Sequence, residues 1–135
     1  MTRTEEREQA FVIVFEKAFN NDTEVDELIA FAKESELFSD SLFSESLAKS
    51  VFENIEKIDE IIEKYSIGWS KERLPKVSLS ILRIALCEIM FVDSIPESVS
   101  VNEAVELAKK FATESDASFI NGILGSYLRG LNGNE

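Results

Sequence analysis

The sequence predicts an all-α protein, a single compact helical domain of six or seven helices. Three observations support this fold class. Apolar residues recur at spacings of three and four through most of the chain, which is the periodicity of a helix face. Five glycines and two prolines leave few residues for the tight turns of a β-rich fold. A hydrophobic fraction of 44%, with ten phenylalanines, is enough for one core, so we expect one domain over residues 1–135.

The first half of the chain is predicted to contain three or four helices. The first covers residues 3–19, and the second begins at Thr23 or Asp26. Residues 33–41 are polar and form a loop, and residues 41–65 form one long helix or two in series. The side chains expected to be buried before residue 41 are Ala10, Phe11, Val14, Phe15, Ala18, Phe19, Leu28, Ile29, Phe31, Ala32, Leu37 and Phe38.

The second half is predicted to contain one central helix followed by two amphipathic helices. Residues 76–92 are apolar on nearly every side, which is typical of a buried central helix. Ser100 and Glu103 have the spacing of a capping box and predict where the next helix begins. The last helix is expected from Asp116 to about Arg129. Four glycines are expected to permit close approach of another backbone or to end this helix: Gly122, Gly125, Gly130 and Gly133.

Negative charge dominates the chain but is unevenly distributed. The formal net charge is -12, a balance that repels polyanions at long range. Residues 1–68 carry 17 acidic against 7 basic side chains, whereas residues 69–135 carry 9 against 7. Basic residues also cluster between Lys71 and Arg83, so the second half should repel nucleic acid less than the first half does.

Several classes of chemistry are excluded by residue counts. The chain has no histidine and one cysteine, which rules out zinc sites and Ser-His or Cys-His nucleophiles. We expect Cys87 to be a small buried hydrophobe. Glu103 and Glu106 are expected to make a cap and surface ion pairs, so we predict a binding module without catalytic residues, metal or cofactor. The charged N-terminus and the absence of a long apolar run predict a cytoplasmic protein.

Three features could bind a ligand, and each has a structural alternative. Arg3 and Arg7 lie on one helix face with Phe11 and Phe15. Basic side chains beside aromatic rings can hold single-stranded RNA. Alternatively, the rings belong to the core and the arginines pair with nearby glutamates.

The other two features lie in the second half of the chain. Arg83 interrupts an apolar helix, so it either pairs internally, with Glu88 or an acid of another helix, or reaches a site. The edge formed by Lys109, Lys110 and Phe111, with residues 113–118, either caps the last helix or contacts a ligand.

Five segments resemble motifs of the transcription antitermination protein NusB family. Three of them are similar to its central and C-terminal motifs: ILRIALCEIMF, IPESVSVNEAVELAKKF and FINGIL. REQAFVIVF, from Arg7, is similar to its N-terminal helix, and RLPKV at residues 73–77 to the lead-in to its central helix. The resemblance covers the chain end to end and is strongest over residues 73–125.

This resemblance implies a non-catalytic RNA-binding factor. Such proteins bind the boxA element of ribosomal RNA leaders as a heterodimer with a small-subunit ribosomal protein, NusE, and so act indirectly on the RNA polymerase elongation complex. Some members also self-associate as a homodimer. Carried over to this sequence, the RNA-binding residues would be Arg3, Arg7, Phe15, Arg83, Phe111, Asp116 and Phe119.

The sequence departs from the family pattern at the expected RNA edge. Glu5 and Glu6 lie between Arg3 and Arg7, and residues 115–118 contain no base. With two to four basic side chains at the site, we expect the logarithm of the RNA-binding constant to fall with the logarithm of the salt concentration with a slope of about -1.5 to -3. The intrinsic RNA affinity should therefore be weak. An alternative is therefore a protein-interaction module that has lost RNA binding. A third alternative, the helical domain of ribosomal RNA cytosine methyltransferases, is disfavoured because a catalytic domain would not fit within 135 residues.

Overall fold

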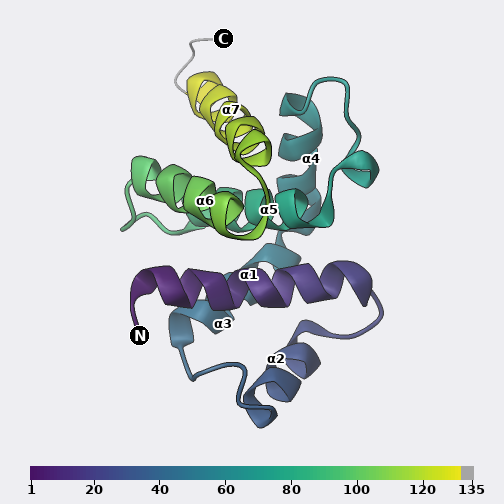
Figure 1. Ribbon diagram of the computed structural model, residues 1–135, viewed down its shortest axis with the longest axis vertical. Coiled ribbons are helices and arrows are strands. Elements are labelled where there is room, and N and C mark those ends of the chain that lie inside the picture. The colour runs from purple at the N-terminus through teal and green to yellow at the C-terminus, as the bar shows by residue number, and fades with distance from the viewer. Residues whose placement is uncertain (132–135) are drawn as a thin grey trace.

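The computed structural model describes residues 1–131, which form helices and contain no strand (Figure 1). The elements are α1 (Arg3–Phe19), α2 (Val25–Glu34), α3 (Leu42–Glu53), α4 (Ile55–Tyr65), the 3₁₀ helix η1 (Lys71–Arg73), α5 (Lys76–Phe91), α6 (Glu97–Phe111) and α7 (Glu114–Leu131). The predicted all-α class is confirmed, and the segment over residues 41–65 is two helices. Gly133, expected to help end the last helix, lies outside the described residues.

Helix α5 is the centre of the fold, as its uniform apolarity predicts. It packs against α1, α3, α4, α6 and α7. Its side chains Ile81, Leu82, Leu86 and Cys87 are fully buried. Figure 1 shows α1 crossing the middle of the molecule, with α2 and α3 on one side and α4 to α7 on the other. Helix α1 therefore contacts both parts of the protein, and its two sides meet different neighbours.

The helix starts depend on caps that only partly follow the predicted pattern. Helix α1 covers residues 3–19 as predicted, and Thr2 and Glu5 form a capping box at its start. The capping box predicted at Ser100 and Glu103 is wrong, because the N-cap of α6 lies four residues earlier, at Pro96, and the helix begins at Glu97. Its N-cap is Pro96, whose fixed φ of -60° suits the entry to a helix. Ser100 and Glu103 thus lie inside α6, where their side chains are available for contacts with other helices.

Three aromatic or aliphatic residues predicted to be buried are instead at the surface. Phe19, Phe31 and Leu37 are 61%, 64% and 75% exposed. Glu36 has a φ of 62°, a left-handed conformation that is uncommon for a residue with a side chain. After this turn Phe38 enters the core while Leu37 is left outside.

The expected close backbone approach at the α7 glycines is also wrong. A Cβ at Gly122 would meet nothing within 4 Å, and one at Gly125 would meet only the Arg129 side chain, at 3.2 Å. Helix α7 also begins earlier than predicted, at Glu114.

No helix within residues 1–131 is long and apolar enough to cross a membrane.

We predict that Cys87 will be unreactive in the folded protein. Burial among α5 neighbours raises the pKa of its thiol to about 11. Near pH 8 only about one thiol in a thousand is then ionised, and the thiolate is the reactive form. Iodoacetamide should therefore label Cys87 in denaturant but not in buffer, as measured by intact mass. Labelling at equal rates in the two conditions would contradict this prediction.

Candidate nucleic-acid interface

Arg7 lies below the surface, at the junction of three helices. It is 3% exposed, and its Nε donates to Glu88 Oε2 of α5 at 2.7 Å. Its Nη1 donates to Glu103 Oε1 of α6 at 3.1 Å. Ser100 Oγ donates to the other Glu88 oxygen at 2.6 Å, and Thr4 Oγ1 donates to Glu103 Oε1 at 2.6 Å. Arg7 is thus paired with acids, as one of the two alternatives expected, but with Glu88 and Glu103 and not with the neighbouring glutamates, and its guanidinium fixes α1 against α5 and α6.

Arg3 remains accessible at the start of α1. Its guanidinium carbon lies 4.0 Å from the centroid of the Phe43 ring, and its Nη1 pairs with Glu6 at 3.3 Å. Half of its side chain is exposed. Of the two arginines predicted on this helix face, only Arg3 can therefore reach a ligand.

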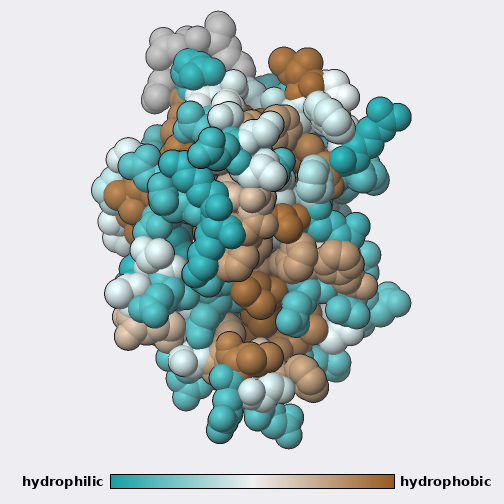
Figure 2. All heavy atoms as spheres, viewed as in Figure 1, coloured by the Kyte–Doolittle hydropathy of each residue, from teal (hydrophilic) through white to brown (hydrophobic). Residues whose placement is uncertain are grey.

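A continuous series of phenylalanine rings, the aromatic row, runs from the end of α6 along α1. Its members are Phe111, Phe11, Phe15 and Phe19, with consecutive ring centroids 5.2, 5.9 and 5.1 Å apart. Phe11 is buried, Phe15 is half-buried, and Phe111 is 39% exposed. Hydrophobic side chains gather in the middle of the face that α1 crosses (Figure 2). The structure thus brings the predicted residues Phe15 and Phe111 to one surface, through Phe11.

Lysine side chains accompany the aromatic row. Lys110 Nζ lies 5.3 Å from the Phe111 centroid and contacts both carboxylate oxygens of Glu8 at 2.9 Å. Lys76 Nζ lies 5.3 Å from the centroid of Phe19. Lys110 belongs to the edge with Phe111 that the sequence offered as a possible ligand contact, but it was not among the RNA-binding residues carried over from the family, and neither was Lys76. The Lys76 contact joins residues 57 positions apart, which no local pattern signals.

Arg83 is paired internally, with an acid of another helix. Its Nε and Nη2 each lie 2.9 Å from one oxygen of Asp59 in α4, a bidentate arrangement. Lys71 Nζ approaches the same carboxylate at 3.4 Å. The expected alternative partner Glu88 is occupied by Arg7, so Arg83 ties α4 to α5.

The start of α7 is organised by a local cap. Thr113 Oγ1 accepts from the Asp116 backbone N–H at 3.0 Å and donates to Asp116 Oδ2 at 2.8 Å. Phe119, one turn later, is half-buried against the core. Of the two alternatives for residues 113–118, the structure therefore contains the cap.

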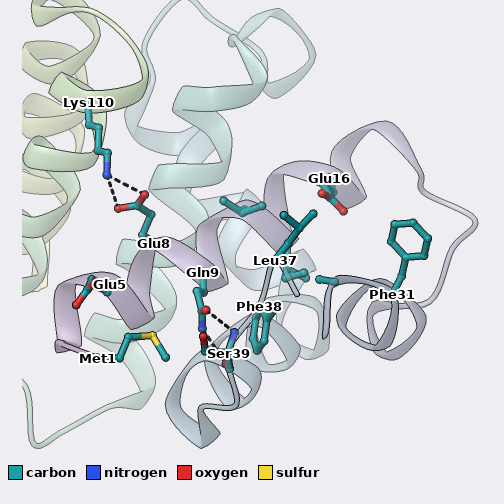
Figure 3. A pocket seen from close by; sticks show the side chains of 13 residues that line it. Met1, Glu5, Glu8, Gln9, Glu16, Phe31, Leu37, Phe38, Ser39 and Lys110 are labelled. Atoms are coloured by element: carbon teal, nitrogen blue, oxygen red, sulfur yellow. Dashed lines mark hydrogen bonds and ion pairs between the residues drawn. The ribbon is translucent and has the colours of Figure 1, made fainter. Parts of the chain in front are cut away.

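On the other side of α1 a groove of about 380 Å³ separates this helix from α2 and the turn that follows it (Figure 3). Apolar side chains, including Phe31 and Leu37, line it, and Gln9 binds the backbone of Ser39 at its floor. Three acids, Glu5, Glu8 and Glu16, also line it against one base, Lys110. This charge disfavours RNA, so the aromatic row and not the groove is the candidate nucleic-acid interface.

Comparisons with known proteins agree on one family. The NusB family model matches residues 4–129. The transcription antitermination protein NusB of Natranaerobius thermophilus is 47% identical, covering 98% of both chains, and that of Finegoldia magna is 39% identical, covering 96% of this chain and 95% of its own.

Solved structures share the fold. A structure of T. maritima NusB has a TM-score of 0.82 at 30% identity, covering 93% of this chain and 89% of its own. A structure of the antitermination factors NusB and NusE in complex with dsRNA has a TM-score of 0.84 at 27% identity, covering 96% of this chain and 99% of its own.

We predict that Arg7→Ala will strongly destabilise the protein. The change leaves Glu88 buried without its cation, and breaking a buried pair in this way costs about 3–5 kcal/mol. Urea unfolding followed by circular dichroism measures the loss. Arg3→Ala is the control, because its exposed pair with Glu6 should contribute under about 1 kcal/mol. Equal losses in the two variants would show that Arg7 is not a buried anchor.

We predict that Arg83→Ala will act mainly on stability. Asp59 would keep only the longer contact with Lys71, so the melting temperature should fall by several degrees. Thermal unfolding of Arg83→Ala and of Arg83→Ala with Asp59→Leu tests this, because removing both charges should recover much of the loss. A variant that melts like the wild type would contradict the structural role.

Proposed function

Because this chain belongs to the NusB family, we propose that it is a non-catalytic RNA-binding factor in transcription antitermination. In this proposal it binds boxA-type single-stranded RNA in the bacterial cytoplasm, together with a NusE-type ribosomal protein. The observation that carries the RNA assignment is the surface that combines Phe15, Phe111 and Lys110. Exposed aromatic rings beside basic side chains can hold unpaired nucleotides, because the rings stack with the nucleobases and the basic side chains contact the phosphates.

The predicted site residues take two different roles in this proposal. Phe15 and Phe111 stack with bases, and Phe119, in the second turn of α7, offers a further partly exposed ring. Arg3 contacts phosphate. The remaining predicted residues are positioning residues: Arg7, Arg83 and Asp116. Their ion pairs and cap fix α1, α5 and the α6–α7 junction before RNA binds, so the rings need little rearrangement.

The charge of the surface supports dependence on a partner. Arg7 is buried against two acids, and Glu8 neutralises Lys110, so few cations remain for phosphates at this end of α1. A basic partner would supply the missing charge and would be attracted by the strongly acidic first half of the chain. We therefore expect the heterodimer to bind RNA more tightly than either protein alone.

The test is binding of a labelled boxA-type RNA to this protein, to the NusE-type protein of the same genome, and to their mixture. Phe111→Ala should weaken RNA binding by the mixture about fivefold or more, since one stacked base contributes about 1–3 kcal/mol. Phe31→Ala is the control, an exposed phenylalanine outside the aromatic row. Heterodimer formation is measured separately by size-exclusion chromatography.

Each outcome separates two functions. RNA affinity that rises in the mixture and falls with Phe111→Ala supports the antitermination role. A stable heterodimer that gains no RNA affinity would favour a protein-interaction module that has lost RNA binding.

A further inference from the structure

We propose that the groove between α1 and α2 is a docking site for a basic amphipathic helix of a protein partner. The groove shares only Lys110 with the proposed RNA site, and the inference goes beyond the proposed function. It rests on three properties of the groove. Exposed apolar side chains are held in place at its centre, the acids around them lack cations, and its length matches about three turns of a helix.

Exposed apolar side chains form the centre of the groove. Val12 of α1, Phe31 of α2 and Leu37 of the following turn all line it, and each is exposed to solvent. Figure 3 shows Leu37 beside α1 and Phe31 projecting from α2. Apolar side chains that gather in this way mark a surface that binds another molecule, because covering them removes apolar area from water.

Hydrogen bonds hold the turn after α2 against α1 before any partner binds. Gln9 Oε1 accepts from the Ser39 backbone N–H at 2.8 Å, and its Nε2 donates to the Ser39 carbonyl at 3.2 Å. The Leu37 N–H donates to the Ala32 carbonyl at 2.9 Å, a bond that closes the end of α2. Phe38 is buried in the core beside them. A surface fixed in this way loses little conformational entropy when it binds.

The acids around the groove are in excess over the cations that could neutralise them. Lys110, the base that lines the groove, is already paired with Glu8 at 2.9 Å. Glu16, together with Glu34 and Glu36 at the end of α2, has no ion-pair partner within residues 1–131. An apolar centre with negative surroundings attracts lysine and arginine side chains and repels RNA and acidic segments.

The spacing of these groups fits a helix that lies along the groove. Glu5 and Glu16 are eleven residues apart on α1, about 16 Å along its axis, and an α-helix covers that length in three turns. Such a helix can place its apolar face on Phe31 and Leu37 and a basic side chain near each acid, which is the helix-in-groove mode of recognition. A second copy of the same groove is disfavoured as the occupant, because it would bring like charges together.

The experiment measures binding of a fluorescein-labelled amphipathic peptide to the full chain by fluorescence anisotropy, without RNA. The peptide has about 12 residues, with leucines on one helix face and lysines beside them, and a second peptide carries glutamates in place of the lysines. Leu37→Ser and Glu16→Gln alter the groove. Their matched controls are Ile67→Ser, an exposed aliphatic side chain outside the groove, and Glu60→Gln, an exposed acid on α4. All four side chains lie at the surface, so the variants should fold, and circular dichroism checks this.

We expect Leu37→Ser to weaken binding of the lysine peptide about fivefold or more, and Glu16→Gln to weaken it and reduce its salt dependence. Both controls should bind like the wild type. No binding by the wild type, an equal loss in Ile67→Ser, or equal affinity for the glutamate peptide would overturn the proposal. Size-exclusion chromatography that shows a dimer of the wild type, lost in Leu37→Ser, would assign the groove to a second copy and overturn it too. Because RNA is absent, none of these outcomes bears on the proposed function.

Discussion

The buried guanidinium of Arg7 is the constraint on which the candidate surface depends. A cation removed from water needs carboxylates at fixed positions, and here α5 and α6 each supply one. Once Arg7 is placed, the rotation of α1 is set. Residues four apart on a helix turn by about 40° relative to each other, so the series from Arg7 through Phe11 and Phe15 to Phe19 moves from the core to solvent. The aromatic row is a direct consequence of this rotation.

The same anchoring reconciles an acidic protein with a role in RNA binding. Net charge describes the whole chain, whereas a strand of RNA meets only one surface at short range. Acids are concentrated on α1's groove side and on α2, and the bases near the ends of the aromatic row come from α5, α6 and η1. The acids of the groove and the rings of the aromatic row thus lie on different parts of the α1 surface, which the ion pair between Glu8 and Lys110 joins.

Helix periodicity was sufficient to predict the fold class and most of the elements, because each helix buries one stripe against α5 or α1. The candidate site was harder to predict, for identifiable reasons. Arg7 has glutamates at positions 5, 6 and 8, but its partners are 81 and 96 residues away in the chain. Ser100 and Glu103 have the spacing of a capping box and equally that of two side chains on one helix face, and Pro96 decides between them. Phe31 and Leu37 are apolar and yet exposed, since the left-handed turn at Glu36 is invisible to a hydrophobic pattern.

The ion pair between Lys110 and Glu8 means that charge alone is a weak basis for binding at this surface. The Glu8 carboxylate already occupies Lys110, and any anion that binds this lysine must first displace it. A ligand that offers charge alone, such as duplex backbone or a free polyphosphate, exchanges one ion pair for another and gains little. A ligand that also places a base on Phe111 gains the stacking energy in addition. The pair therefore lowers affinity for every anion that uses Lys110, so that tight binding depends on the additional stacking energy.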